Sequence, residues 1–530
     1  MVLTTSCSGG STPDGSKAVK KGEVSTGTAK GRVDAVTWYG DYRPLYTLDP
    51  IKLADYPEET ILPNMCEGLL RFSPHYKLEP ALAQRWKYTS PTELTLMLRK
   101  GVKFWDGTPM TADDVVYSLR RNLDPDEASN YAYLFSKVKK VAATDADTVT
   151  ITFSQPAPTF VSALTMNGGA IMSKAFGKKA GADLGSPKTG VMCTGPFKFT
   201  SYDGSSKLVM TRNLNYWDAG HAALARTFTF EFPADSSALV NGLKSGQIEG
   251  GFSIPSSLLR DLNGVSSGRV YVGDKGTSPV SVGLLMISAE GPSAQPVLRQ
   301  ALSRAIDRTA IADKVYYGAA DSLYDAAGSG LWGYATHTYK AAADQLAKKY
   351  SYDTAAAKKL AKSVPGASKP LSLAYPADSQ YTALATAIQQ EAKAVGIDIE
   401  LRALSLQQYG NLFADAGARA KYDMMITKNY VEAPEPLEME TITAIPGGAT
   451  NMSNYDNAQV AKLLDQASQA SDRQKRATLV TEAAKQINTD LPTIPLVQLR
   501  STTFISNKLT GAPLNFTFMT SPWAARIGTP

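Results

Sequence analysis

Few residues in this 530-residue sequence have the types and spacing that catalysis or metal binding requires. The three histidines and three cysteines are scattered, and no group of them has the spacing of metal ligands. A match to G-x-G-x-x-G at Gly328, Gly330 and Gly333 follows no predicted strand and opens no predicted helix. The sequence has no Walker loop, no G-x-S-x-G elbow and no histidine placed to serve a nucleophile. We therefore predict a binding protein without a metal or cofactor, and not an enzyme.

The polar stretch with the clearest chemical potential spans residues 422–436, YDMMITKNYVEAPEP. A predicted strand there runs into a loop that is punctuated by prolines and carries carboxylates, Glu432 among them. Such a carboxylate can bind a cationic group of a ligand, or it can simply solvate the loop. The residues alone leave both interpretations open.

The charge distribution gives little support to a nucleic-acid partner. The net charge is +6, and residues 8–32 supply about half of it because five basic residues there face two acidic ones. No basic patch interleaved with aromatic residues occurs in the rest of the chain. With 43% hydrophobic and 20% charged residues, the composition is that of a globular protein with an ample core. No apolar run reaches the roughly 18 residues of a membrane span.

Periodic patterns predict the elements that must hold the polar loop in place. Leu94, Leu96 and Leu98 alternate with Thr and Met, as in a half-buried strand, and a turn and a second short strand are predicted to follow. Thr111 then precedes Asp114 by three residues, which predicts a capped helix start. A parallel βαβ unit is predicted with its strand, helix and strand at residues 371–375, 380–395 and 397–401.

Several motifs resemble the signature of a known family. Residues 98–104 (LRKGVKF), 106–109 (DGTP) and 111–116 (TADDVV) are similar to segments of the solute-binding proteins of ABC importers, in the family that binds oligopeptides, dipeptides and nickel. The resemblance extends over about residues 33–512. It implies an α/β fold of the periplasmic-binding-protein type, with two lobes joined by two crossovers and an extra subdomain on lobe I.

The resemblance also divides the chain into parts. Residues 1–32 are interpreted as a lipoprotein-like flexible tether, because Gly, Ser, Thr, Lys and Pro dominate most of this segment. The implied folded parts are the core of lobe I (residues 33–70, 190–277 and 503–530), its second subdomain (residues 71–189) and lobe II (residues 278–502).

Residues of a ligand cleft between the lobes are implied in the same way. Glu432 takes the place of an aspartate that pairs with the peptide's amino-terminal ammonium in the oligopeptide binders, and Asn429 replaces a tryptophan. Tyr131 matches an aromatic residue that reaches over the ligand; alternatively it packs the subdomain. Asp55 and Tyr56 match a segment that offers backbone groups to the ligand, or they form a surface turn. The remaining cleft positions are Tyr381 and Tyr430.

Roles for the cysteines also come from the resemblance. Cys66 and Cys193 fall in elements that the family places in one layer, and an extracytoplasmic compartment permits disulfides. We therefore expect a Cys66–Cys193 bridge, with two buried free thiols as the alternative. Cys7, in LTTSCSGG, resembles the lipid-modified cysteine of a bacterial lipoprotein; the alternative is an incidental thiol in a disordered tail.

The implied function is that of a bacterial extracytoplasmic receptor, held at the membrane by its lipid anchor. As a monomer it would trap an oligopeptide between its lobes and present it to the permease subunits of an ABC transporter. No arginine follows residues 371–375, which disfavours a dedicated dipeptide site. One alternative is a non-peptide ligand such as an oligosaccharide, an opine or a metal chelate, since Trp38, Tyr39 and Tyr42 would suit stacking on sugars. A peptide-sensing receptor without import is another.

Overall fold

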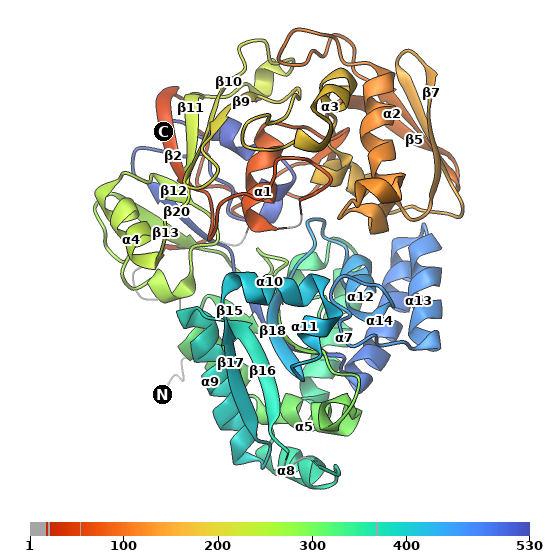
Figure 1. Cartoon of the computed structure of the whole chain (residues 1–530), viewed down its shortest axis with the longest axis vertical. Helices are drawn as coiled ribbons and strands as arrows, with labels where there is room; N and C mark the ends of the chain where they lie inside the picture. Colours follow the sequence, from red (N-terminus) through yellow and green to blue (C-terminus); the bar gives the residue numbers. More distant parts are fainter. Residues whose placement is uncertain (1–16, 20–21, 54, 367–368) are drawn as a thin grey trace, which may run out of the picture.

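The computed structural model of the chain describes residues 17–19, 22–53, 55–366 and 369–530. Figure 1 shows two lobes, one above the other, each built around its own β-sheet. We call the upper body lobe I and the lower body lobe II. The chain enters lobe II between strands β13 and β14 and returns to lobe I between β19 and β20.

Lobe I is organised by a mixed sheet with β2 in its interior. In order across the sheet its strands are β1 (Lys17–Ala18), β13 (Gly268–Val272), β20 (Thr502–Ser506), β12 (Gly250–Gly251), β2 (Val33–Tyr39), β11 (Ala225–Glu231), β10 (Lys207–Arg212) and β9 (Phe197–Tyr202). Trp38 of β2 packs against Phe252 and Trp523, with ring centroids 5.2 and 5.0 Å away. Trp523 lies in the C-terminal segment, which therefore completes the lobe I core. Helices α1 (Tyr56–Ile61) and α4 (Ser236–Ser245) also belong to this lobe.

The chain just before β2 packs on lobe I where the structure describes it, which differs from the predicted flexible tether. Strand β1 pairs in parallel with β13. The backbone N–H of Thr26 donates to the carbonyl oxygen of Ala512 at 2.9 Å, and that of Lys30 donates to Thr529 at 2.9 Å. Backbone hydrogen bonds of this kind need no apolar side chains. For this reason, composition alone did not reveal the packing.

A smaller antiparallel sheet forms the extra subdomain of lobe I. Its order is β5 (Ala83–Ser90), β6 (Glu93–Leu98), β8 (Thr148–Phe153) and β7 (Val138–Asp145), and the neighbouring elements are β3 (Leu70–Phe72), β4 (Leu78–Pro80), α2 (Ala112–Arg120) and α3 (Lys174–Ala180). The capped start of α2 is confirmed, because Asp114 Oδ2 accepts from the backbone N–H and the hydroxyl of Thr111 at 2.9 and 2.6 Å. The second strand predicted after Leu98 was wrong: the chain turns back at Gly107, and β6 pairs with β5 and β8.

A disulfide joins Cys66 to Cys193, as expected, and links residues 127 positions apart. Cys66 follows the 3-10 turn η1 (Leu62–Asn64), and Cys193 precedes β9. Between these two positions the chain makes the whole small sheet. The bridge therefore closes the extra subdomain at its base and restricts the unfolded chain over a long loop.

Lobe II contains a second mixed sheet. In order its strands are β15 (Ala320–Ser322), β19 (Thr493–Leu499), β14 (Ser281–Met286), β18 (Met424–Asn429), β16 (Leu371–Pro376) and β17 (Ile399–Leu404). Strands β16 and β17 run parallel and are connected through α9 (Ser379–Ala394), which confirms the predicted βαβ unit. The other helices of the lobe are α5 (Pro296–Ala305), α6 (Arg308–Ala310), α7 (Thr336–Lys349), α8 (Thr354–Lys362), α10 (Leu406–Ala414), α11 (Ala416–Arg419), α12 (Pro436–Ala444), α13 (Ala458–Gln469) and α14 (Arg473–Asp490). Among the described residues, no helix has the length and apolar character of a membrane span.

Lobe II also buries a pair of carboxyl groups, Asp325 and Glu440. Glu440 on α12 is fully buried, and the amide of Asn488 donates to Asp325 Oδ1 at 2.9 Å. Burial is the main cause that raises the pKa of both groups, and the charge of Asp325 raises the pKa of Glu440 further. Two buried carboxylates cannot both ionise without repelling each other at close range.

We expect the Glu440→Gln variant to lose less stability than the wild type as the pH rises. The pKa of Glu440 is higher in the folded state than in the unfolded chain. The contribution of Glu440 to the free energy of unfolding is therefore full below the unfolded-state pKa and is lost as the pH rises through the folded-state pKa. The loss is at most about 1.4 kcal/mol per pH unit. Thermal unfolding between about pH 5 and about pH 9 measures the difference. Glu482→Gln, on the exposed face of α14, is the control. Equal pH slopes in all three proteins would contradict the assignment.

Candidate ligand-binding cleft

The two lobes meet at a group of carboxyl and tyrosine side chains. Tyr131 of lobe I lies with its hydroxyl 2.9 Å from Glu59 Oε1 and 3.3 Å from Glu432 Oε1. From lobe II, the Tyr430 hydroxyl donates to Glu59 Oε2 at 2.7 Å. Glu59 of lobe I and Glu432 of lobe II therefore face each other across the boundary, and tyrosines from both lobes surround them.

Local structure explains how these side chains arrive there. Asp55 caps α1, with its carboxylate accepting from the Tyr56 backbone N–H at 2.8 Å, and this cap sets the first turn that carries Glu59. On lobe II, β18 pairs with β14 up to Asn429, which fixes where Tyr430 leaves the sheet. The Tyr56 and Tyr430 rings then pack together with centroids 4.5 Å apart.

Burial dominates the electrostatics of the facing pair. Glu59 is 3% and Glu432 is 5% exposed. Burial raises the pKa of both carboxyl groups, and the charge of Glu432 raises the pKa of Glu59 further, whereas the tyrosine hydroxyls act in the opposite direction. Within the described chain, neither carboxylate has a Lys, Arg or His within ion-pair distance. A proton or an external cation must therefore compensate them.

The carboxylates next to the facing pair, unlike the pair itself, have arginine partners. Glu58, next to Glu59 on α1, pairs with Arg43 at 2.8 Å. Glu435, three residues after Glu432, pairs with Arg476 at 3.2 Å. The fold thus supplies an arginine to each structural carboxylate beside the boundary and leaves the facing pair without one.

A third carboxyl group, Glu438, adjoins the pair. It lies in the first turn of α12, and the Tyr133 hydroxyl of lobe I donates to its Oε1 at 2.8 Å. Burial, together with the charge of Glu432, raises the pKa of Glu438 to about 8. The Tyr133 side chain is nevertheless 40% exposed, so this corner adjoins a space between the lobes and is not filled by protein.

The other side of the cleft carries charges of both signs. Tyr42 and Arg43 both donate to Asp55, Arg43 at 2.8 Å. The ammonium of Lys428 lies 5.5 Å from the ring centroid of Tyr381. Lys428 has accessible surface, yet burial lowers its pKa while the charges of Asp41, Asp378 and Asp55 raise it. Lys428 is thus an exposed cation of lobe II whose pKa is influenced by acidic side chains of both lobes.

The structure thus gathers six of the predicted positions around the cleft. These are Tyr42, Asp55, Tyr56, Tyr131, Tyr430 and Glu432, and Tyr381 lies beside Lys428. Tyr39 is buried in a core cluster with helix α4, and Asn429 is buried on β18. Trp38 is fully buried in the lobe I core and offers no face for stacking on a sugar. Cys7 lies outside the described residues.

Sequence reasoning missed Glu59, Glu438 and Lys428. Glu59 belongs to a short helix whose other residues are mostly buried, and a carboxylate within such a helix is a signal that it meets a specific partner. Glu438 and Lys428 carry no comparable signal, because their neighbours in the cleft come from segments that are distant in sequence.

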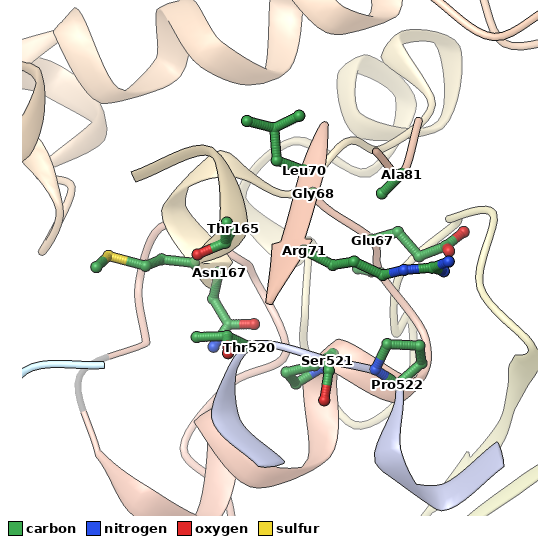
Figure 2. Close-up of a pocket in the computed structure, with 13 residues that line it drawn as sticks. Glu67, Gly68, Leu70, Arg71, Ala81, Thr165, Asn167, Thr520, Ser521 and Pro522 are labelled. Atoms are coloured by element: carbon green, nitrogen blue, oxygen red, sulfur yellow. The ribbon is translucent and has the colours of Figure 1, made fainter. Parts of the chain in front are cut away.

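A separate hollow inside lobe I is structural. Figure 2 shows it beside Glu67, Arg71, Asn167 and Thr520. Its volume of about 10 Å³ is roughly that needed for one water molecule. Arg71 Nε, Asn167 Nδ2 and Thr520 Oγ1 are buried there without a hydrogen-bond partner among the described residues. A water-sized polar hollow of this kind is too small for a peptide.

Two lobes joined by two crossovers, with carboxylates at their boundary, have the architecture of a periplasmic substrate-binding protein. The family model "Bacterial extracellular solute-binding proteins, family 5 Middle" matches residues 77–451. The chain belongs to this family, whose members are described as binding proteins and not as enzymes.

Relatives and solved structures agree with this assignment. The chain is 25% identical to the periplasmic murein peptide-binding protein MppA of Escherichia coli K12 over 517 residues, covering 93% of both chains. The oligopeptide-binding protein AppA of Bacillus subtilis, solved with a nonapeptide, shares the fold with a TM-score of 0.80 at 17% identity, covering 94% of this chain and 99% of AppA. The binding protein AgaA of A. tumefaciens R10, solved with agropinic acid, has a TM-score of 0.79 at 23% identity, covering 94% and 98%.

We expect the ligand-free protein to close more fully as the pH falls. In the arrangement that the structure shows, burial raises the pKa of Glu59 and of Glu432, and the charge of Glu432 raises the pKa of Glu59 further. This arrangement should therefore bind more protons than an open form with both groups in water. Closure is therefore favoured below the raised pKa values and is lost as pH rises through them. Small-angle scattering should give a smaller radius of gyration at about pH 5 than at about pH 8.

The Glu59→Gln variant, which cannot ionise at this position, should show a weaker dependence, and Glu482→Gln should behave like the wild type. A radius of gyration that is independent of pH in the wild type would contradict the prediction.

Proposed function

We propose that this protein captures peptides by holding their amino-terminal ammonium between Glu59 of lobe I and Glu432 of lobe II. The observation that carries the proposal is the facing pair of buried carboxylates without a basic side chain. An ammonium has three donors and one positive charge, so it can bridge both carboxylates and draw the lobes together.

The peptide class is supported by the surroundings of the pair. Strand β18 ends at Asn429, shortly before Glu432, and backbone groups where a strand ends can bind an extended peptide whatever its side chains. Tyr56, Tyr131 and Tyr430 supply large rings with polar tips, which suit a site that accepts varied side chains. Relatives named for murein peptides and oligopeptides support the same class.

The cellular role follows from the family. The protein is proposed to act outside the cytoplasm as a monomer, anchored to a bacterial membrane through a lipid on Cys7, and to deliver its peptide to the permease subunits of an ABC transporter. Hinge closure around the peptide would distinguish the loaded form from the empty one for the permease.

A non-peptide ligand is the second candidate. The fold shared with AgaA, solved with agropinic acid, favours it. An opine-like ligand would leave synthetic peptides unbound, so the experiment below separates the two classes.

We expect Glu432→Gln and N-acetylation of the peptide to have similar, non-additive effects. Loss of one partner of a desolvated charge pair costs on the order of 2–5 kcal/mol, so each change should weaken binding about thirtyfold or more. Acetylation should harm the variant less than the wild type, since Glu432→Gln has already removed one of the two carboxylate contacts of the ammonium. Calorimetry with Lys-Ala-Ala and its N-acetyl form, on wild type and variant, gives the four affinities. Glu482→Gln is the matched surface control.

Equal affinity of the wild type for the free and acetylated peptides would show that Glu432 does not bind an amine. Absence of binding to every peptide would favour the non-peptide class.

A further inference from the structure

The cleft contains more uncompensated carboxyl groups than one ammonium can neutralise. Glu59, Glu432 and Glu438 lie together, and within the described chain none of them has a basic side chain at ion-pair distance. Lys137 is near this part of the boundary by sequence, but its ammonium donates to Ser468. If all three were ionised, one peptide amino terminus would leave an excess of negative charge, so a proton or a second cation must compensate the rest.

Donor counting gives a second, independent observation. The side-chain donors that reach the three carboxyl groups are the hydroxyls of Tyr131, Tyr133 and Tyr430, each with a single proton. Tyr131 lies closer to Glu59 than to Glu432, at 2.9 against 3.3 Å. Glu432 is 95% buried. Among the described residues, no side-chain donor bonds to Glu432 alone, because Tyr131 is shared with Glu59. Because a carboxylate can accept several hydrogen bonds, the three groups keep acceptor capacity that the donors of a ligand can fill.

The corner at Glu438 is open to such a ligand. Tyr133 donates to Glu438 from the opposite lobe and keeps part of its ring accessible. An aromatic face beside a carboxylate is a favourable environment for an ammonium or guanidinium group, since the ring attracts the cation while the carboxylate pairs with it. The same two residues therefore offer both a charge partner and a stacking surface.

Glu438 also lies next to the proposed ammonium site. It follows Glu432 on the same loop and helix start, and the charge of Glu432 is the largest electrostatic influence on its pKa. In a lysine or arginine at the start of a peptide, the side chain branches from the carbon that carries the α-ammonium. A first residue of this type can place one positive charge at each position.

We propose that Glu438 and Tyr133 form a subsite for the positively charged side chain of the ligand's first residue, so that the cleft prefers peptides that begin with Lys or Arg. This inference rests on the proposed function, because it takes the ammonium to lie between Glu59 and Glu432. It adds a specificity that the amino terminus alone does not give.

The test compares Lys-Ala-Ala with norleucine-Ala-Ala, in which the first side chain keeps its length in carbon atoms but has no charge. Calorimetry on the full chain should show the lysine peptide binding at least about tenfold more tightly to the wild type, in line with a partly desolvated charge pair. Glu438→Gln should abolish this preference, measured as the ratio of the affinities for the two peptides. Tyr133→Phe should reduce the preference, and the surface variant Glu482→Gln should retain it.

The outcomes separate the two proposals. Binding of both peptides with equal affinity, each weakened by N-acetylation, would overturn the Glu438 subsite and leave the ammonium site intact. Binding of neither peptide would overturn the proposed function itself. The wild-type comparison needs no variant, so it decides the question even if Glu438→Gln folds poorly; thermal unfolding of each variant checks that point.

Discussion

The closed arrangement of this protein depends on how two buried carboxyl groups are kept next to each other. Glu59 and Glu432 come from different lobes and are each at least 95% buried, so closure brings like charges together in a poorly solvated place. Tyrosine hydroxyls offset part of the cost, and a proton or a cation must supply the rest. On the proposed function, ligand binding and lobe closure would be coupled through one interaction, because a group that neutralises the pair also removes the repulsion between the lobes.

The surrounding scaffold makes this coupling selective. Glu58 and Glu59 are adjacent on helix α1, yet Glu58 pairs with Arg43 whereas Glu59 faces the cleft. The loop after β18 likewise sends Glu435 to Arg476 and leaves Glu432 facing lobe I. The compensated carboxylates hold their own elements in place. The uncompensated ones remain available, and within each lobe the sheets and helix caps set their positions.

The division into lobes gives the cleft its range of chemistry. One side holds Glu59, Glu432 and Glu438 with their tyrosines, whereas the other holds Lys428 among Asp41, Asp55 and Asp378. Lobe I is stabilised elsewhere, by the core around Trp38 and by the Cys66–Cys193 bridge, and lobe II is stabilised by its own apolar core around β14 and β16. Side chains in the cleft can therefore differ among proteins of this fold without loss of the architecture, which is why the fold alone does not identify the ligand.

The sequence by itself determined the elements whose causes are local. The Thr111–Asp114 cap and the parallel strands of residues 371–401 follow from short-range patterns and were confirmed. Motifs shared with the family also placed Glu432 at the cleft and paired the cysteines. Only the tertiary structure decided which carboxylates go without an arginine, because Arg43 and Arg476 reach Glu58 and Glu435 from positions that periodicity cannot relate to them. The tertiary structure also buried Trp38 in the core of lobe I, since the residues that cover its ring come from three distant segments of the chain.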